Sequence, residues 1–239
     1  MPIGRPGVEV SAVIDLGAIT RNARAAVASA LTPLLADVRH DALGHGLTQV
    51  ARAALDAGVE GLLVSPAETD AARAAFPDAT IVPASPAAAV PAQWALVSRE
   101  LYGLPGTAGE PVLRAAGRVV NVKPVRAREG VSYGYLHRAP TDSRLALVTG
   151  GYAQGVVRAL GSRADVMIDG RRHPIVGRVA MDVCVVDIGD DPVAIGDEVV
   201  YLGTADGEPT LAEWAEATKL DAAELAVGVA SRFDKEYRS

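Results

Sequence analysis

The sequence predicts an α/β fold for its first part and an all-β fold for the rest. Over the first ~80 residues, short apolar runs alternate with amphipathic segments, a β-α-β-α-β pattern typical of parallel strands. Beyond them, short β-branched runs follow one another without helices, which indicates an antiparallel sheet. Residues 104–109 have loop composition. We therefore expect two domains, residues 1–105 and 106–239.

The first region opens with an alternating strand over residues 11–16, followed by a helix over 19–30 with Asp15 or Thr20 as its N-cap. Residues 34–38 predict a short buried strand. The next helix is indicated by apolar residues at helical spacing, and Gly58 is a suitable stop. These residues are Leu47, Val50, Ala51, Ala54 and Leu55. A strand over 61–64, a helix over 67–76 and a strand over 80–82 complete the region.

The second region predicts a small antiparallel domain that is a closed or nearly closed barrel. Its expected strands cover 118–125, 145–149, 166–168, 175–179, 183–188 and 198–202. Asp169-Gly170 is a hairpin-turn signal. Thr210 with Glu213, and Asp221 with Glu224, have capping-box spacing and predict two helices near the end.

Composition excludes several classes of protein. A net charge of −6 with interspersed arginines argues against a nucleic-acid-binding face. The single cysteine, Cys184, excludes an internal disulfide and lies in an apolar run, so we expect a buried thiol. Residues 80–97 carry no charge, but Pro83, Pro86 and Pro91 exclude a membrane-spanning helix. With no signal peptide evident, we expect a cytoplasmic protein without membrane or metal sites.

The stretch VRHDALGHG, residues 38–46, predicts a strand, a tight turn and a helix. Its Arg39 can pair with a carboxylate or phosphate through two hydrogen bonds, but a guanidinium stays protonated and is no amine nucleophile. We expect Asp41 to be the N-cap acceptor of the following helix, with its carboxylate bonded to the first amides. His45 is expected to fix the entrance to that helix through a hydrogen bond.

Several segments of the sequence resemble segments of the alanine racemase family. REGVSYG (128–134), GGYAQGVVRAL (150–160), GRVAMDVCVVDI (177–188) and IGDEVVYLG (195–203) resemble its C-terminal domain in order and spacing. AVIDLGAITRNARA (12–25), DALGHG (41–46) and LYGL (101–104) resemble its N-terminal barrel.

The resemblance implies a pyridoxal phosphate enzyme whose site combines a barrel lysine with a tyrosine from the partner subunit. Tyr133 stands at the position of the catalytic tyrosine, while Tyr152 and Met181 match positions lining the substrate entrance and the carboxylate site. Arg39 stands where the family has its Schiff-base lysine, and Leu43 where it has a phosphate-binding tyrosine.

One further family position departs from the pattern. The arginine that bonds the cofactor's pyridine nitrogen aligns with Leu96, and Arg99 fills that role only if the turn is rebuilt.

The N-terminal region is too short for the complete barrel that the resemblance implies. A (β/α)₈ barrel takes roughly 250 residues, with a floor near 200, whereas only ~105 residues precede the predicted boundary. We therefore expect the remnant of a (β/α) barrel, too short to close as eight strands, followed by an alanine-racemase-like C-terminal β-barrel domain. About four strand–helix units would be missing between Ser85 and Trp94. The edges of such a sheet could be covered in three ways: by the helices of an open sheet, by a second copy of the chain, or by another protein. We favour an open sheet, within a homodimer formed by the C-terminal domain.

Three functions remain open at this point, and we favour the first, in which the chain does not itself racemise alanine. The first is an inactive binding or regulatory homologue without cofactor, paired with itself or with a full-length racemase. The second is an active alanine or amino-acid racemase that uses pyridoxal phosphate, or Tyr133 with a base foreign to the family. The third is a sensor in which Arg39 holds a small anionic ligand.

Overall fold

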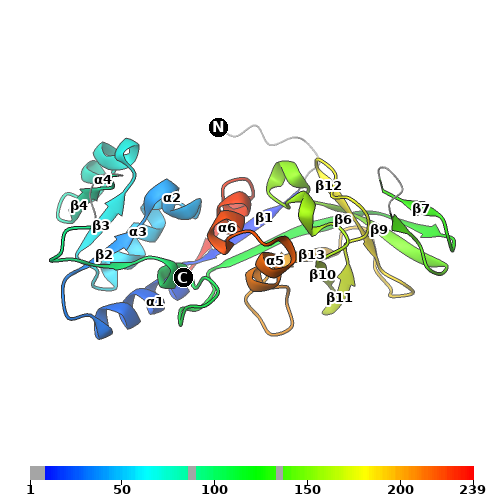
Figure 1. The fold of residues 1–239 in the computed structure, drawn as a ribbon, viewed down its shortest axis with the longest axis horizontal. Coiled ribbons are helices and arrows are strands. Elements are labelled where there is room, and N and C mark those ends of the chain that lie inside the picture. Colours follow the sequence, from blue (N-terminus) through cyan, green and yellow to red (C-terminus); the bar gives the residue numbers. More distant parts are fainter. Residues whose placement is uncertain (1–8, 86–89, 133–136) are drawn as a thin grey trace. The chain divides into compact units, whose positions relative to one another are not determined.

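The computed structural model describes residues 9–85, 90–132 and 137–239 (Figure 1). They divide into two compact units. The α/β unit comprises Val13–Leu113 with Glu236–Ser239, and the β unit comprises Arg114–Lys235 with the N-terminal residues up to Ala12. No helix of the described residues is long and apolar enough to cross a membrane.

The α/β unit contains a four-stranded sheet in the order β4-β3-β2-β5, with every neighbouring pair parallel. Its strands are β2 (Leu34–Asp37), β3 (Gly61–Val64), β4 (Thr80–Pro83) and β5 (Ala95–Val97). Every residue of β2 and β3 is buried, so both faces of the central strands are covered. Across the described residues no pairing joins β4 to β5, and the sheet is open along this path.

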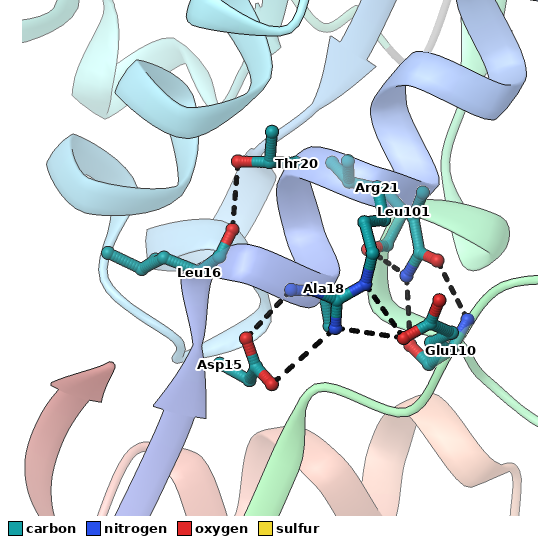
Figure 2. A network of polar contacts seen from close by, with 8 residues as sticks. Asp15, Leu16, Ala18, Thr20, Arg21, Leu101 and Glu110 are labelled. Atoms are coloured by element: carbon teal, nitrogen blue, oxygen red, sulfur yellow. Dashed lines mark hydrogen bonds and ion pairs between the residues drawn. The ribbon is translucent and has the colours of Figure 1, made fainter. Parts of the chain in front are cut away.

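The helices of the α/β unit follow strands or short turns. They are α1 (Leu16–Ser29), α3 (Leu47–Asp56) and α4 (Thr69–Ala75), with 3₁₀ turns η1 (Pro66–Glu68) and η2 (Arg99–Tyr102). Asp15 is the N-cap of α1 and accepts a 2.7 Å bond from the Ala18 amide, whereas Thr20 bonds back to the Leu16 carbonyl (Figure 2). The helix predicted over 67–76 is divided, because a capping box of Ser65 and Glu68 first forms the η1 turn.

Helix α1 also anchors the segment that follows β5. The buried Asn22 amide donates to the Leu101 and Glu110 carbonyls at 3.1 and 2.8 Å and accepts from the Glu110 amide at 2.7 Å. Arg21 pairs with the Glu110 carboxylate at 2.9 Å (Figure 2). The η2 turn is therefore tied to α1 by a backbone carbonyl bond at Leu101.

The first strand departs from the prediction. β1 (Ser11–Asp15) is not part of the parallel sheet but neighbours β6 and β14 (Asp234–Arg238). Its burial alternates residue by residue, unlike the continuous burial of β2 and β3. Such alternation is typical of a strand with one covered face, whereas strands of parallel sheets are apolar throughout.

The strands of the β unit pair in a circuit whose last step is a single isolated bridge. Its pairings run β12-β9-β6-β13-β10-β11, and a bridge from Ile175, next to β11, to Val186 of β12 completes the circuit. The strands are β6 (Leu113–Val125), β9 (Ser143–Thr149), β10 (Asp165–Ile168), β11 (Arg171–Pro174), β12 (Val183–Asp187) and β13 (Glu198–Leu202). A separate hairpin joins β7 (Gly130–Val131) to β8 (His137–Arg138).

Local signals in the β unit are mostly confirmed. The β10–β11 hairpin turns at Asp169 and Gly170, both with positive φ. The strand predicted over 175–179 is wrong: Ile175 forms an isolated bridge to Val186 and the Val176 amide donates to the Val185 carbonyl at 2.8 Å, but no strand continues past Gly177, at φ +73°.

The two predicted helices, α5 (Leu211–Thr218) and α6 (Ala222–Ala230), are present in the β unit. Thr210 caps α5 through a reciprocal box with Glu213, and Asp221 caps α6.

The single thiol is buried, as predicted. Cys184 is 1% exposed and donates to the Gly150 carbonyl at 3.0 Å. Burial raises its pKa to about 12. The buried Tyr201 hydroxyl donates to the Thr149 carbonyl at 2.6 Å. Cys184 therefore contributes to packing and is not a nucleophile at ordinary pH.

Candidate functional site

The turn after β2 has a left-handed backbone. In the segment α2 (Arg39–Leu43), the φ angles of His40, Asp41, Ala42 and Leu43 lie between 53° and 57°. Four successive residues other than glycine in this region are strained, and such strain persists only where surrounding contacts impose it. Here those contacts include the Ser65 hydroxyl, which accepts from the His40 amide at 2.9 Å.

Two acidic side chains hold the same turn. Glu68 accepts from the Asp41 amide at 2.6 Å, and Asp41 accepts from the Leu47 amide, the first of α3, at 2.8 Å. The predicted bond from Asp41 to the start of the next helix is therefore confirmed, although Gly46 is the N-cap residue. Both carboxylates bind backbone amides, which leaves them structural roles.

His45 is 1% exposed and has the structural role that the sequence predicts. Its Nδ1 lies 2.9 Å from the Ala42 carbonyl and 3.0 Å from the Leu43 carbonyl. Because both neighbours accept, Nδ1 must carry a hydrogen and donate. The ring also packs against Tyr102 at a centroid distance of 5.1 Å.

The turn also carries an ion pair between Arg39 and Asp37. Asp37 Oδ1 accepts from Arg39 Nε and Asp37 Oδ2 from Arg39 Nη2, both at 2.7 Å. Ser98, directly after β5, donates to Asp37 Oδ2 at 2.9 Å. The Asp37 side chain is 8% exposed and that of Arg39 is 39% exposed. A buried carboxylate thus holds a half-exposed guanidinium in a bidentate geometry.

Electrostatics keep both members of this pair charged. Burial alone raises the pKa of Asp37, but the hydrogen bonds from Arg39 and Ser98 and the arginine's charge outweigh it, so the pKa lies below its usual value. The hydrogen bond to Asp37 raises the pKa of Arg39. Tyr102 donates to the Asp37 carbonyl at 2.7 Å, and its burial raises its own pKa well above the ordinary value.

Asp37 and Ser98 were not predicted from the sequence. A signal was present: Asp37 ends an otherwise apolar buried strand and precedes Arg39 by two residues. Opposite charges two residues apart can pair when a turn brings them together, as here, where Val38 at φ −113° and ψ 24° is not extended. Ser98 could not have been found, because its proximity depends on the pairing of β5 with β2.

Two of the predicted residues of the β unit, Tyr152 and Met181, lie in adjacent turns. The Tyr152 amide donates to the Ala180 carbonyl at 3.0 Å, and the Ala153 amide donates to the Met181 carbonyl at 2.9 Å. Met181 is 46% exposed, and the Tyr152 ring lies 4.3 Å from the Arg158 guanidinium carbon. Tyr133 lies outside the described residues.

The positions that match other cofactor-binding residues of the family are apolar, and the lysines lie in the β unit. Leu96 in β5 is 37% exposed, and Leu43 belongs to the left-handed turn. The only three lysines, Lys123, Lys219 and Lys235, all belong to the β unit. The described residues contain no cluster of acidic, histidine or cysteine side chains that could hold a metal ion.

Comparison with known proteins gives consistent matches. The family model "Alanine racemase, N-terminal domain" matches residues 14–100, and "Alanine racemase, C-terminal domain" matches residues 112–237. The alanine racemase of Mycolicibacterium vanbaalenii is 41% identical over 180 residues, covering 74% of this chain and 45% of that protein. That of Mycobacterium leprae is 45% identical over 131 residues, covering 54% and 34%. The chain thus spans less than half the length of these curated relatives.

Solved structures share the fold. Alanine racemase from Streptomyces coelicolor superposes with a TM-score of 0.87 at 24% identity, over 97% of this chain and 98% of that one. The Bartonella henselae enzyme with covalently bound pyridoxal phosphate gives 0.85 at 19% identity, over 96% and 99%.

Proposed function

Because this chain belongs to the alanine racemase family, we propose that it is a binding or regulatory member that does not itself racemise alanine. The observation that carries the proposal is the bidentate pair of Arg39 with Asp37. It lies at the end of β2, where the family resemblance places the lysine that binds the cofactor.

The residues present do not fit pyridoxal phosphate. This cofactor supplies an electron sink after its aldehyde condenses with a primary amine. A guanidinium is permanently protonated and delocalised, so Arg39 offers no such amine. Leu43 and Leu96 provide neither a hydroxyl for the phosphate nor a cation for the pyridine nitrogen. No lysine of the chain belongs to the α/β unit.

The α/β unit is, in this proposal, the remnant of a (β/α) barrel, with residues 1–105 and 106–239 as the functional domains. Support comes from the sheet order, in which β5 pairs directly with β2 while β4 forms the far edge. An eight-stranded barrel places its last strand beside its first in the same way. The fully buried β2 and β3 favour an open sheet that is already covered.

A homodimer formed by the β unit is the proposed assembly, and a full-length racemase is the alternative partner. Tyr133, Tyr152 and Met181 would then face a site contributed by the partner. Arg39 is less suited to holding a small anionic ligand, because Asp37 already neutralises its charge and occupies Nε and Nη2.

The test uses the chain as purified, without added cofactor. We expect no absorbance from a pyridoxal imine, no D-alanine formed from L-alanine, and a dimer by size-exclusion chromatography with light scattering. A yellow protein that racemises alanine would overturn the proposal. It would instead support an active racemase, with Tyr133 and a base foreign to the family.

A second measurement addresses the partner. The chain is mixed with a full-length alanine racemase, and complex formation and rate are followed together. A mixed dimer with a changed rate supports a regulatory role. A homodimer that leaves the rate unchanged supports a binding role confined to copies of this chain, and a monomer under all conditions contradicts the assembly.

A further inference from the structure

We infer that Asp37 is a positioning residue that commits residue 39 to an ion pair, so that a lysine returned to position 39 would not act as an amine until Asp37 is neutralised. This rests on the proposed function, because it concerns the position of the missing lysine. The inference goes beyond the proposed function, because it assigns the loss of the amine nucleophile to both Arg39 and Asp37.

Hydrogen bonds within the chain hold the Asp37 carboxylate in place without any ligand. Its two carboxylate oxygens accept three side-chain hydrogen bonds, from Arg39 Nε and Nη2 at 2.7 Å and from Ser98 at 2.9 Å. Its backbone carbonyl accepts from Tyr102. A carboxylate buried to this extent is costly unless a cation pairs with it. The position therefore requires a positive charge at residue 39.

A lysine in the same rotamer would place its Nζ near the position of the guanidinium carbon of Arg39. That position faces both oxygens of Asp37, which now bind Nε and Nη2. A carboxylate at this distance favours the ammonium form, and attack on an aldehyde requires the neutral amine. Each unit of such a shift lowers the neutral fraction about tenfold.

Glu68 provides a matched control at the same edge of the sheet. It carries the same charge, but its oxygens accept from the backbone amides of Asp41 and Ser65. No contact joins Glu68 to Arg39 among the hydrogen bonds and ion pairs of the described residues. Neutralising Glu68 therefore removes a nearby negative charge without freeing a cation at residue 39.

The experiment measures amine reactivity and not turnover. Arg39→Lys, Arg39→Lys/Asp37→Asn and Arg39→Lys/Glu68→Gln are incubated with pyridoxal phosphate and reduced with borohydride. The adduct at residue 39 is then quantified by peptide mass spectrometry, with the adduct at Lys219 in the same sample as the internal reference. We expect the normalised adduct in Arg39→Lys/Asp37→Asn to exceed that in Arg39→Lys by about 10- to 100-fold, from one to two units of pKa shift.

Two results would overturn the inference. One is an Arg39→Lys variant that reacts as readily as the Asp37→Asn double variant. The other is a Glu68→Gln double variant that gains as much as the Asp37→Asn one. If the Asp37→Asn variant fails to fold, Arg39→Lys alone decides: its normalised adduct in buffer should be at least about tenfold below that in urea, and equal values refute the inference.

The outcome is independent of the test of the proposed function. That test uses the unmodified chain and no added cofactor, whereas this one uses Arg39→Lys variants. An active unmodified chain would refute the proposed function and leave the measurement at residue 39 interpretable.

Discussion

Replacing Asp37 by asparagine should destabilise the α/β unit, and the structure supplies the magnitude. The change removes the charge from a side chain that is 8% exposed and pairs with Arg39 through two bonds of 2.7 Å. A hydrogen bond to a charged group contributes about 1.5–3 kcal/mol, and an exposed ion pair at most about 1 kcal/mol. Asparagine can keep the Ser98 bond, and Arg39, at 39% exposure, can be hydrated. We expect the free energy of unfolding to fall by about 2 kcal/mol.

The assay is urea denaturation at about pH 7 of the unmodified chain, Asp37→Asn, Arg39→Gln and the double variant. The double-mutant cycle should give a coupling energy of about 1–2 kcal/mol. Asp70→Asn is the matched control, because Asp70 is fully exposed in its 3.9 Å pair with Arg73. Its replacement should leave the midpoint unchanged.

The same prediction can be tested by measuring how the stability difference between the unmodified chain and Asp37→Asn changes at low pH. The pKa of Asp37 is lower in the folded chain than its usual value, so folding favours the ionised carboxylate. Its contribution is complete above the unfolded value of about 3.9 and is lost as the pH falls through the folded value. The gap between the unmodified chain and Asp37→Asn should therefore narrow below about pH 4. A coupling energy near zero, or a gap that widens in acid, would refute the ion-pair reasoning.

Three further predictions concern the β unit. Cys184, with its pKa raised to about 12 by burial, should resist a thiol reagent in the native state and react after denaturation; ready native labelling contradicts the buried placement. Thr210→Ala should lower stability by about 1 kcal/mol through loss of the α5 cap, with Thr210→Ser close to unchanged as the control in the same denaturation assay. Gly151→Ala should destabilise by more than about 1 kcal/mol, because its Cβ would lie 2.3 Å from the Met181 carbonyl oxygen, while Gly228→Ala in α6, whose Cβ would approach no atom closer than 3.8 Å, meets no such contact. Denaturation that treats both glycine variants alike would argue against the close approach at residue 151.

Much of the fold could be predicted because its signals are local. Asp15 is followed by helical spacing, Asp169-Gly170 makes a tight hairpin, and Thr210 stands three residues before Glu213. Each of these depends on the conformation of a few neighbouring residues. The prediction of a strand over 175–179 was wrong because the chain bends at Gly177, and a run of β-branched residues carries no information about that bend.

The candidate site was predictable only in part. Arg39 was identified from its phrase, and the structural use of His45 and Asp41 followed from their place between a strand and a helix. The opposite charges of Asp37 and Arg39, two residues apart, could have suggested their pairing, but its geometry depends on the turn at Val38, which is not extended. The left-handed turn over residues 40–43 had no sequence signal, since none of these residues is glycine.

By itself the sequence determined the family, the order of most elements, and the absence of an amine at position 39, because these depend on residue identity and on short-range backbone preferences. The tertiary structure decided which distant segments meet. It placed β5 beside β2, brought Ser98 to the Asp37 carboxylate 61 residues away in the chain, and placed β1 beside β6 and β14 rather than in the parallel sheet. Such contacts arise from packing and strand pairing across the chain, for which a linear pattern of residue types carries no distance information.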